Sequence, residues 1–207
     1  MSELSASWKR VWEGLDAAGD GSALRSALEA RYSEPWRKYH TLQHLGECLT
    51  LFASVAHNAE RPAEVEAALW FHDAVYELRA GDNEEQSASW AKSALLAAGV
   101  NQAAAARTAQ LVLATKHTAV PSLPDGQLLV DIDLSILGAA VDRFQEYEEQ
   151  VRAEYSFVPD ATFKAKRAEI LQSFLARPRI YSTEHFHAKL EQSARSNLAR
   201  SLAAIAA

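Results

Sequence analysis

The chain is poor in cysteine, in basic residues and in long apolar stretches, and each shortage excludes a class of protein. Cys48 is the one cysteine among 207 residues, so no internal disulfide can form, and the sequence fits a reducing compartment. Lysine and arginine number 21 against 27 aspartates and glutamates, which gives a formal net charge of −6. A chain this acidic lacks the basic surface that binding to a nucleic-acid polymer requires.

Membrane and secretion signals are equally scarce. No apolar run approaches the roughly 18 residues that a transmembrane helix needs. The N-terminus, MSELSASWKR, has no apolar core of the signal-peptide kind. Apolar residues nevertheless make up 48% of the chain, which is enough for a packed core. We therefore expect a cytoplasmic protein of one domain that binds neither membranes nor nucleic-acid polymers, and nothing in the sequence indicates an oligomer.

Helix signals recur along the chain, whereas strand signals are few. Alanine is abundant, β-branched runs are short, and capping residues or breakers separate the periodic apolar stretches. Thr41 and Pro62 begin predicted helices, and Asp82 and Asn101 are predicted N-caps. Pro178 interrupts the chain before a long last helix. The predicted fold is all-α, with about nine or ten helices in one bundle-like domain.

The predicted fourth helix, PAEVEAALWFHDAVYEL, carries polar residues on an apolar stripe. Val65, Leu69, His72 and Tyr76 share one face, and Asp73 follows His72 directly. Because burying an unpaired carboxylate is costly, a His-Asp pair at this position needs a partner or a metal ion. A structural His-Asp hydrogen bond in the core is the alternative.

The segment LLVDIDLSILG contains a second polar anomaly. If it is helical, Asp133 has apolar neighbours on both sides, whereas Asp131 can reach a polar edge. The alternative is a strand with both aspartates on one polar face, although the surrounding helices favour a helix. A buried-face histidine, the His-Asp dipeptide and a late buried aspartate together supply four nitrogen and oxygen ligands for a divalent ion.

These features, in this order, resemble the HD superfamily of metal-dependent phosphohydrolases, whose pattern is His … His-Asp … Asp on an all-α fold. The chain is most similar to the small stand-alone bacterial group of that superfamily. The resemblance implies a single HD-type domain, residues 1–207, with a metal-site core at about 39–138 and flanking helices at both ends. The matching stretches are YHTLQH at 39–44, ALWFHDAVY at 68–76, DNEEQSA at 82–88, DIDLSILG at 131–138 and ARSNL at 194–198.

Carried over by position, the resemblance makes His44, His72, Asp73 and Asp133 the metal ligands, with Asp131 as the rival to Asp133. The helix-face argument also selects Asp133. The implied cofactor is one divalent ion, which could be Mn²⁺, Mg²⁺, Co²⁺, Ni²⁺, Zn²⁺ or Fe²⁺. The implied activity is hydrolysis of a phosphoester of a small molecule, for example a nucleotide, by a water that the ion activates.

The resemblance also implies which residues act on the substrate. Asp73 is expected to be catalytic together with Glu77, which stands five positions after His72. Related guanosine-tetraphosphate hydrolases carry an acidic residue at that offset and another acidic residue directly before it. This chain has Tyr76 at the earlier of these two positions. The alternative for Glu77 is a solvated carboxylate at a helix end.

Three basic residues are expected to bind the substrate. His40 lies about one turn before the first ligand, and a purely structural His40 is the alternative. His117, at the end of a predicted helix, and the neighbouring Lys116 are expected to face the phosphorylated substrate. The alternative for His117 is an interaction with the helix dipole. Further candidate phosphate clamps are Arg37, Lys38, Arg152 and Arg167.

Four other polar residues have more than one interpretation. Asn83 and Glu84 could contact substrate or form the first turn of a helix. Arg195 and Asn197 could tie the last helix to another.

Two functions compete with the hydrolase. One is a di-iron oxygenase on an HD-like fold, which would need more histidine ligands. The other is a non-catalytic binding module that retains the metal site. The complete set of four ligands favours the hydrolase over the binding module.

Overall fold

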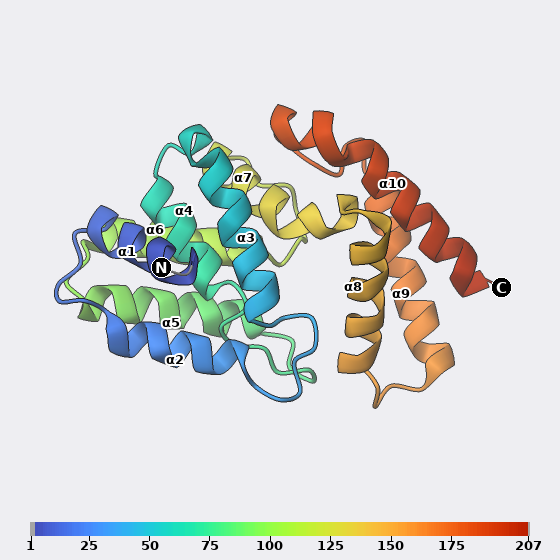
Figure 1. The fold of residues 1–207 in the computed structure, drawn as a ribbon, viewed down its shortest axis with the longest axis horizontal. Helices are drawn as coiled ribbons and strands as arrows, with labels where there is room; N and C mark the ends of the chain where they lie inside the picture. The colour runs from blue at the N-terminus through green and yellow to red at the C-terminus, as the bar shows by residue number, and fades with distance from the viewer. Residues whose placement is uncertain (1–2, 207) are drawn as a thin grey trace. The chain divides into compact units, whose positions relative to one another are not determined.

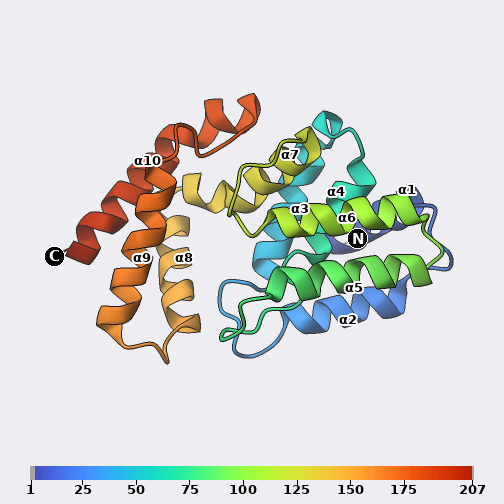
Figure 2. The ribbon, with the colours of Figure 1, turned by 180° about the vertical axis from the view of Figure 1, so that it is seen from behind.

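The computed structural model describes residues 3–206, and this part of the chain is all-α (Figures 1 and 2). It contains ten α-helices, two 3₁₀ helices and no strand, which confirms the predicted fold class. No helix within residues 3–206 combines the length and the apolar character that a membrane crossing demands. The α-helices are α1 (Glu3–Gly14), α2 (Ser22–Tyr32), α3 (Leu42–Val55), α4 (Pro62–Phe71), α5 (Asn83–Ala97), α6 (Gln102–Ala114), α7 (Pro124–Asp133), α8 (Val141–Glu154), α9 (Asp160–Leu175) and α10 (Glu184–Ala206), and the 3₁₀ helices are η1 (Ala56–Asn58) and η2 (Leu134–Gly138).

The chain divides into two compact units, one up to Ile132 and one from Asp133 onwards. The first unit holds α1 to α6, η1 and α7 without its last residue. The second unit holds η2 and α8 to α10. The single-domain organisation that the sequence suggests stays a prediction.

α4 is the central helix of the first unit. It contacts α1, α3, α5 and α6, and every residue from Glu64 to Phe71 is buried. Both buried glutamates are paired. Arg107 of α6 donates from Nε to Glu64 Oε2 at 2.7 Å, and Arg10 of α1 donates from Nη2 to Glu66 Oε1 at 2.6 Å. Because an unpaired carboxylate would be costly in the core, these pairs allow a helix with two acids to be covered on all sides.

Two helices begin at side-chain caps that the sequence indicates. At the start of α3, Thr41 Oγ1 accepts a hydrogen bond from Gln43 N at 3.3 Å. At the start of α6, Asn101 Oδ1 accepts from Ala104 N at 2.9 Å. Such bonds satisfy amides that have no partner inside the helix. Asp82 precedes α5 as predicted, but its side chain makes no capping hydrogen bond.

The predicted fourth helix is shorter than its sequence pattern suggests. α4 ends at Phe71, and the prediction that Tyr76 continues its apolar stripe is wrong. In a continuing helix, Leu69 O would accept from Asp73 N. Instead, Leu69 O lies 2.7 Å from Nδ1 of the His72 ring. His72 is therefore the C-cap of α4, and Asp73 stands in the turn that follows.

The start of α7 is anchored to the start of α4. The Asp125 carboxylate accepts from Glu60 N at 2.7 Å and from Arg61 N at 3.0 Å. These bonds join segments about 65 residues apart in the sequence. They fix the helix that carries the late aspartates relative to the helix that carries the His-Asp dipeptide.

α7 is helical through both late aspartates, which excludes the strand alternative for the DID segment. Asp131 is completely buried, whereas Asp133 is partly exposed. The expectation that Asp133, and not Asp131, is the buried aspartate is therefore wrong. Tertiary packing buries α7 from Leu128 to Ile132, and this burial is not visible in the neighbours of each aspartate along the helix.

α10 organises the second unit by packing on η2 and α9. Asn197 Nδ2 donates to Leu137 O and to Ala139 O, at 2.9 Å in both cases. Arg195 Nη1 donates to Leu175 O, the last residue of α9, at 3.0 Å. The predicted role of Arg195 and Asn197 as structural ties to other helices is confirmed.

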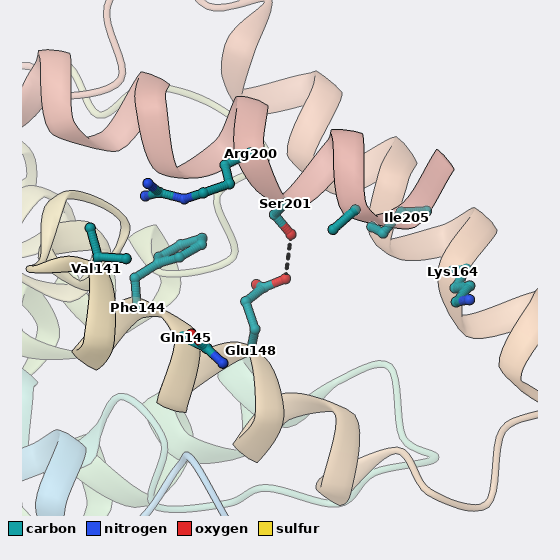
Figure 3. Close-up of a pocket in the computed structure, with 9 residues that line it drawn as sticks. Val141, Phe144, Gln145, Glu148, Lys164, Arg200, Ser201 and Ile205 are labelled. Atoms are coloured by element: carbon teal, nitrogen blue, oxygen red, sulfur yellow. Dashed lines mark hydrogen bonds between the residues drawn. The ribbon is translucent and has the colours of Figure 1, made fainter. Parts of the chain in front are cut away.

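A cavity of about 380 Å³ opens in the second unit and is lined by residues of α8, α9 and α10 (Figure 3). Phe144 and Ile205 contribute apolar surface to it. The Glu148 carboxylate accepts from Ser201 Oγ at 2.6 Å and from Arg167 Nε at 3.1 Å. Arg167 is buried and bound to this internal carboxylate, so its interpretation as a phosphate clamp is wrong.

Candidate metal centre

Two buried histidines from different helices face each other. His44 stands in the first turn of α3, and His72 is the C-cap residue of α4. Their Nε2 atoms lie 3.1 Å apart. His40 is four positions before His44 but stands in the turn before the Thr41 cap. The two histidines of YHTLQH therefore do not share a helix face.

The tautomer of His72 follows from its hydrogen bond. Nδ1 lies 2.7 Å from Leu69 O, which can only accept, so Nδ1 carries the hydrogen. In the neutral ring, Nε2 then presents its lone pair. This lone pair lies 3.0 Å from Asp73 Oδ2, which is also an acceptor. Two acceptors at that distance require a cation or an added proton close to them.

The three donor atoms have the spacing of ligands on one ion. His72 Nε2 lies 3.1 Å from His44 Nε2 and 3.0 Å from Asp73 Oδ2, and His44 Nε2 lies 3.6 Å from Asp73 Oδ2. Neighbouring ligands at about 2.1 Å from an ion, with angles of roughly 90 to 120° between them, are about 3.0 to 3.6 Å apart. The chemistry and the spacing of this donor set therefore fit a divalent ion.

Asp133 adds a carboxylate from the last residue of α7. One nitrogen each from His44 and His72 and one oxygen from Asp133 all lie within 4.8 Å of one another. Both histidines are buried and Asp133 is partly exposed, so this is a largely buried His-His-Asp group that could hold a metal ion. Within the described residues, the group contains Asp133 rather than Asp131.

The surroundings of Asp73 favour its ionised form. Burial raises the pKa of this carboxyl, but the positive charges that His72, His40 and His44 carry when protonated, together with the hydrogen bond to His72, outweigh burial. The net effect holds the pKa of Asp73 below its ordinary value. An ionised carboxylate here is suited to binding a cation.

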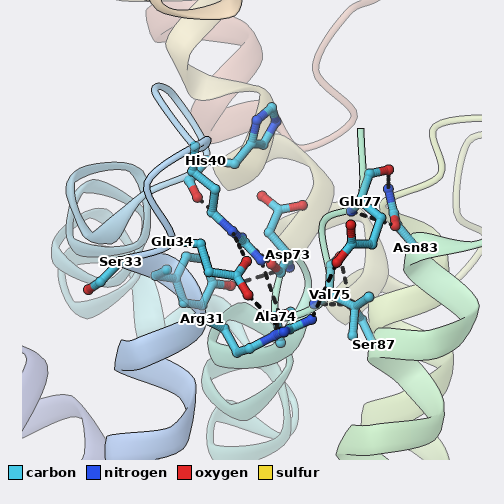
Figure 4. A network of polar contacts seen from close by, with 12 residues as sticks. Arg31, Ser33, Glu34, His40, Asp73, Ala74, Val75, Glu77, Asn83 and Ser87 are labelled. Carbon is cyan, nitrogen blue, oxygen red and sulfur yellow. Dashed lines mark hydrogen bonds and ion pairs between the residues drawn. The ribbon is translucent and has the colours of Figure 1, made fainter. Parts of the chain in front are cut away.

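The main chain at Asp73 is held by a polar network from α2 and the loop after it (Figure 4). Arg37 is buried; its Nη1 donates to Asp73 O at 2.6 Å and its Nη2 donates to Ala74 O at 3.2 Å. Arg37 also pairs with Glu34, Nε to Oε2 at 3.0 Å. A guanidinium bound in this way cannot clamp a substrate phosphate, so that interpretation of Arg37 is wrong.

His40 borders the centre. Its ring stacks on Tyr76 with the centroids 3.9 Å apart and the planes at 26°. Figure 4 shows the His40 ring on the side toward which the Asp73 carboxylate points. Its contribution to the pKa of Asp73 also places it near that carboxylate. This position is compatible with a substrate contact and with the structural alternative alike.

Glu77 lies further from the histidines, in the turn before α5. Its side chain is 54% exposed, and Figure 4 shows its carboxylate turned toward Arg31, with Oε1 4.0 Å from Nη2. Asn83 Oδ1 accepts from Glu77 N at 2.9 Å, and Asn83 Nδ2 donates to Glu77 O at 3.1 Å. Asn83 therefore fixes the turn that carries Glu77. Glu84 lies in the first turn of α5, where an acid is favourable.

Lys116 and His117 follow α6, which ends at Ala114 rather than at His117. Lys116 forms an exposed ion pair with Glu85 of α5. His117 adopts a left-handed backbone conformation, with φ at 54°. Neither residue belongs to the His-His-Asp group. Their role as substrate contacts stays a prediction.

Sequence reasoning overlooked two neighbours of the centre. Tyr32, at the end of α2, accepts from Asp73 N at 3.3 Å through its hydroxyl oxygen. The sulfur of Cys48, one turn after His44 on α3, lies 3.7 Å from His44 Nδ1. The i, i+4 spacing could have indicated the Cys48 contact. No local pattern could have indicated Tyr32, which is 41 positions from Asp73.

Comparison of the chain with protein-family models, with curated proteins and with solved structures finds no match.

Proposed function

We propose that this chain is a metal-dependent hydrolase of phosphoester bonds that acts on a small phosphorylated molecule. The observation that carries the proposal is the largely buried group of His44, His72 and Asp133, which could hold a metal ion, with Asp73 Oδ2 3.0 Å from His72 Nε2. We assign all four residues as ligands of one divalent ion, such as Mn²⁺, Mg²⁺, Co²⁺, Ni²⁺, Zn²⁺ or Fe²⁺.

A bound divalent ion would supply an acidic water, with a pKa lowered from about 16 towards about 7, and would withdraw charge from a phosphoryl oxygen. The protein would contribute the orientation of the ligands. The bond from His72 Nδ1 to Leu69 O directs the Nε2 lone pair into the centre. Asp73 would supply an anionic oxygen ligand.

We assign roles in proton transfer or substrate binding to four residues outside the set of metal ligands. Glu77 is exposed enough to rotate, and we assign it the transfer of a proton to or from the reacting groups. His40, which lies beside the Asp73 carboxylate, is assigned to a phosphate oxygen. Lys116 and His117 are assigned to the remainder of the phosphorylated molecule. Lys116 would exchange its exposed partner Glu85 for the phosphate.

The test is release of inorganic phosphate from a panel of nucleotides and sugar phosphates, assayed with each divalent ion after the protein has been stripped of metal. We expect hydrolysis of at least one compound that depends on added metal and stops with a chelator. His72→Asn should abolish it, because this substitution removes a ligand without adding bulk.

His57→Asn is the matched control, since His57 is an exposed histidine at the end of the neighbouring 3₁₀ helix. It should retain wild-type hydrolysis. Phosphate release that survives both the chelator and His72→Asn would come from another site or another protein, and would contradict the proposal.

A further inference from the structure

The main chain of Asp73 is held at both of its polar groups by side chains from outside α4. Its amide donates to the hydroxyl oxygen of Tyr32 at 3.3 Å, and its carbonyl accepts from Arg37 Nη1 at 2.6 Å. Both side chains are buried, with 1% of Tyr32 and 3% of Arg37 exposed. They come from the last residue of α2 and from the loop after it. Bonds at both the N–H and the C=O fix the main chain of Asp73 and therefore the direction in which its side chain leaves the main chain.

Arg37 also connects the two segments that carry candidate ligands. The same Nη1 that binds Asp73 O lies 3.2 Å from His40 O, in the turn that leads into α3 and His44. One guanidinium nitrogen therefore bonds to the entry of α3 and to the exit of α4. Its Nη2 binds Ala74 O at 3.2 Å, and its Nε is held by Glu34 at 3.0 Å.

Tyr32 completes the arrangement from the opposite side. Its hydroxyl donates to Trp70 O at 3.2 Å, a carbonyl in the last turn of α4. Burial raises the pKa of this phenol well above its ordinary value, so the hydroxyl keeps its proton at any working pH. The tyrosine thus binds α4 just before its end and binds Asp73 just after it.

We propose that Tyr32 and Arg37 are positioning residues for the metal centre, which hold the Asp73 carboxylate and the entry of α3 at the separation that one ion requires. The inference rests on the metal centre of the proposed function but not on hydrolysis. The competing explanation is that these bonds only satisfy carbonyl and amide groups at the end of α4. The two explanations differ in what they predict for metal affinity in a protein that stays folded.

Arg31 provides a matched control. Its Nε binds Ala74 O at 3.2 Å and its Nη1 pairs with Glu34 Oε1 at 2.7 Å, so it shares two partners with Arg37. Arg31 contacts Ala74, Glu34 and Glu77, whereas Arg37 joins Asp73 to His40. Arg31→Lys should therefore disturb the end of α4 about as Arg37→Lys does without releasing Asp73.

The experiment measures the Kd for Mn²⁺ by calorimetry on metal-stripped full-length protein, together with the absorption spectrum of bound Co²⁺. Loss of a group that orients a ligand typically weakens metal binding by about 10 to 100-fold. We expect an increase in Kd of that size for Arg37→Lys and roughly tenfold for Tyr32→Phe, with a changed Co²⁺ spectrum in both. Arg31→Lys should stay within about twofold of the wild type.

Circular dichroism and a melt without metal establish that each variant is folded at the temperature used. If Arg37→Lys does not fold, Tyr32→Phe decides the question, because it removes one hydroxyl and preserves the ring. Wild-type Kd and spectrum in folded Tyr32→Phe would overturn the inference, as would equal loss of affinity in Arg31→Lys. A wild-type protein that binds no divalent ion would overturn it too. Tight metal binding without any phosphate release would contradict the proposed function and leave this inference standing.

Discussion

His72 and Asp73 are neighbours in sequence, and their side chains meet at one point, with His72 Nε2 3.0 Å from Asp73 Oδ2. Within a continuous helix, consecutive side chains point about 100° apart and do not face each other. The end of α4 at Phe71 removes that restriction. A helix terminus is therefore what allows this dipeptide to present both side chains to one centre.

Metal binding should stabilise the wild-type protein through His72. Mn²⁺ at about 100 times its Kd adds roughly 2.7 kcal/mol to the free energy of unfolding. For a chain of this size, that corresponds to an increase in Tm of about 5 to 10 °C. His72→Asn should lose the increase, and the exposed control His57→Asn should keep it. A melting scan with and without Mn²⁺ makes the measurement, and an equal shift in both variants would show that the ion binds elsewhere.

Asp73→Asn should separate stability from activity. With His72 Nδ1 bonded to Leu69 O, an asparagine amide can donate to His72 Nε2, where the carboxylate can only accept. We expect the metal-free variant to melt at or above the wild-type temperature. We also expect phosphate release to fall by roughly a hundredfold to a thousandfold, because an anionic ligand is lost. Retention of both wild-type hydrolysis and the Mn²⁺ melting shift would remove Asp73 from the centre.

Asn83→Ala should destabilise the turn that carries Glu77. The substitution removes two hydrogen bonds to the Glu77 main chain, at 2.9 and 3.1 Å. At about 0.5 to 1.5 kcal/mol for each, we expect a loss of roughly 1 to 3 kcal/mol in urea unfolding. Glu84→Ala, at the next position, should change stability by less than about 0.5 kcal/mol. If the two variants unfold at the same urea concentration, the turn does not depend on the Asn83 side chain.

Lys116→Ala should raise the KM for the phosphorylated substrate with little effect on stability. The pair that Lys116 forms with Glu85 is exposed, and such pairs contribute about 1 kcal/mol or less. Glu85→Ala is the companion variant, because it releases Lys116 for the substrate and should leave KM unchanged or lower. Steady-state kinetics test both variants. An unchanged KM in Lys116→Ala would show that Lys116 does not bind the substrate and only pairs with Glu85.

Glu191 of α10 should make stability depend on pH in the acid range. Burial raises the pKa of this carboxyl, but hydrogen bonds from Ile180 N and Tyr181 N and the Arg195 guanidinium lower it more, so the net pKa is lowered. A carboxyl with a lowered folded-state pKa contributes stability above its unfolded pKa of about 4.3 and loses it as the pH falls through the folded-state value.

The difference in unfolding free energy between the wild type and Glu191→Gln should therefore be roughly 2 kcal/mol at pH 7 and shrink as the pH is lowered from 5 to 3. Urea unfolding of both proteins at each pH makes the measurement. A difference that stays constant across this range would mean that the charge of Glu191 does not matter.

The sequence by itself determined the fold class and several helix boundaries. The caps of α3 and α6 at Thr41 and Asn101 were readable because each bond spans two or three residues. It also brought His44, His72 and Asp133 forward as a set, because their order along the chain resembles the His … His-Asp … Asp pattern. These are properties of short segments, which local chemistry controls.

Only the tertiary structure decided where α4 stops, which aspartate of α7 is fully buried, and what Arg37 and Tyr32 bind. Each of these depends on atoms supplied by distant parts of the chain. The bond from Tyr32 to Asp73 spans 41 positions, and the bond from Arg37 to the same residue spans 36. The burial of Asp131 is a property of the folded chain that its neighbours in sequence do not reveal. Packing determines which polar groups are buried, and a buried polar group without a partner is costly. Packing therefore selects among arrangements that the local sequence pattern does not distinguish.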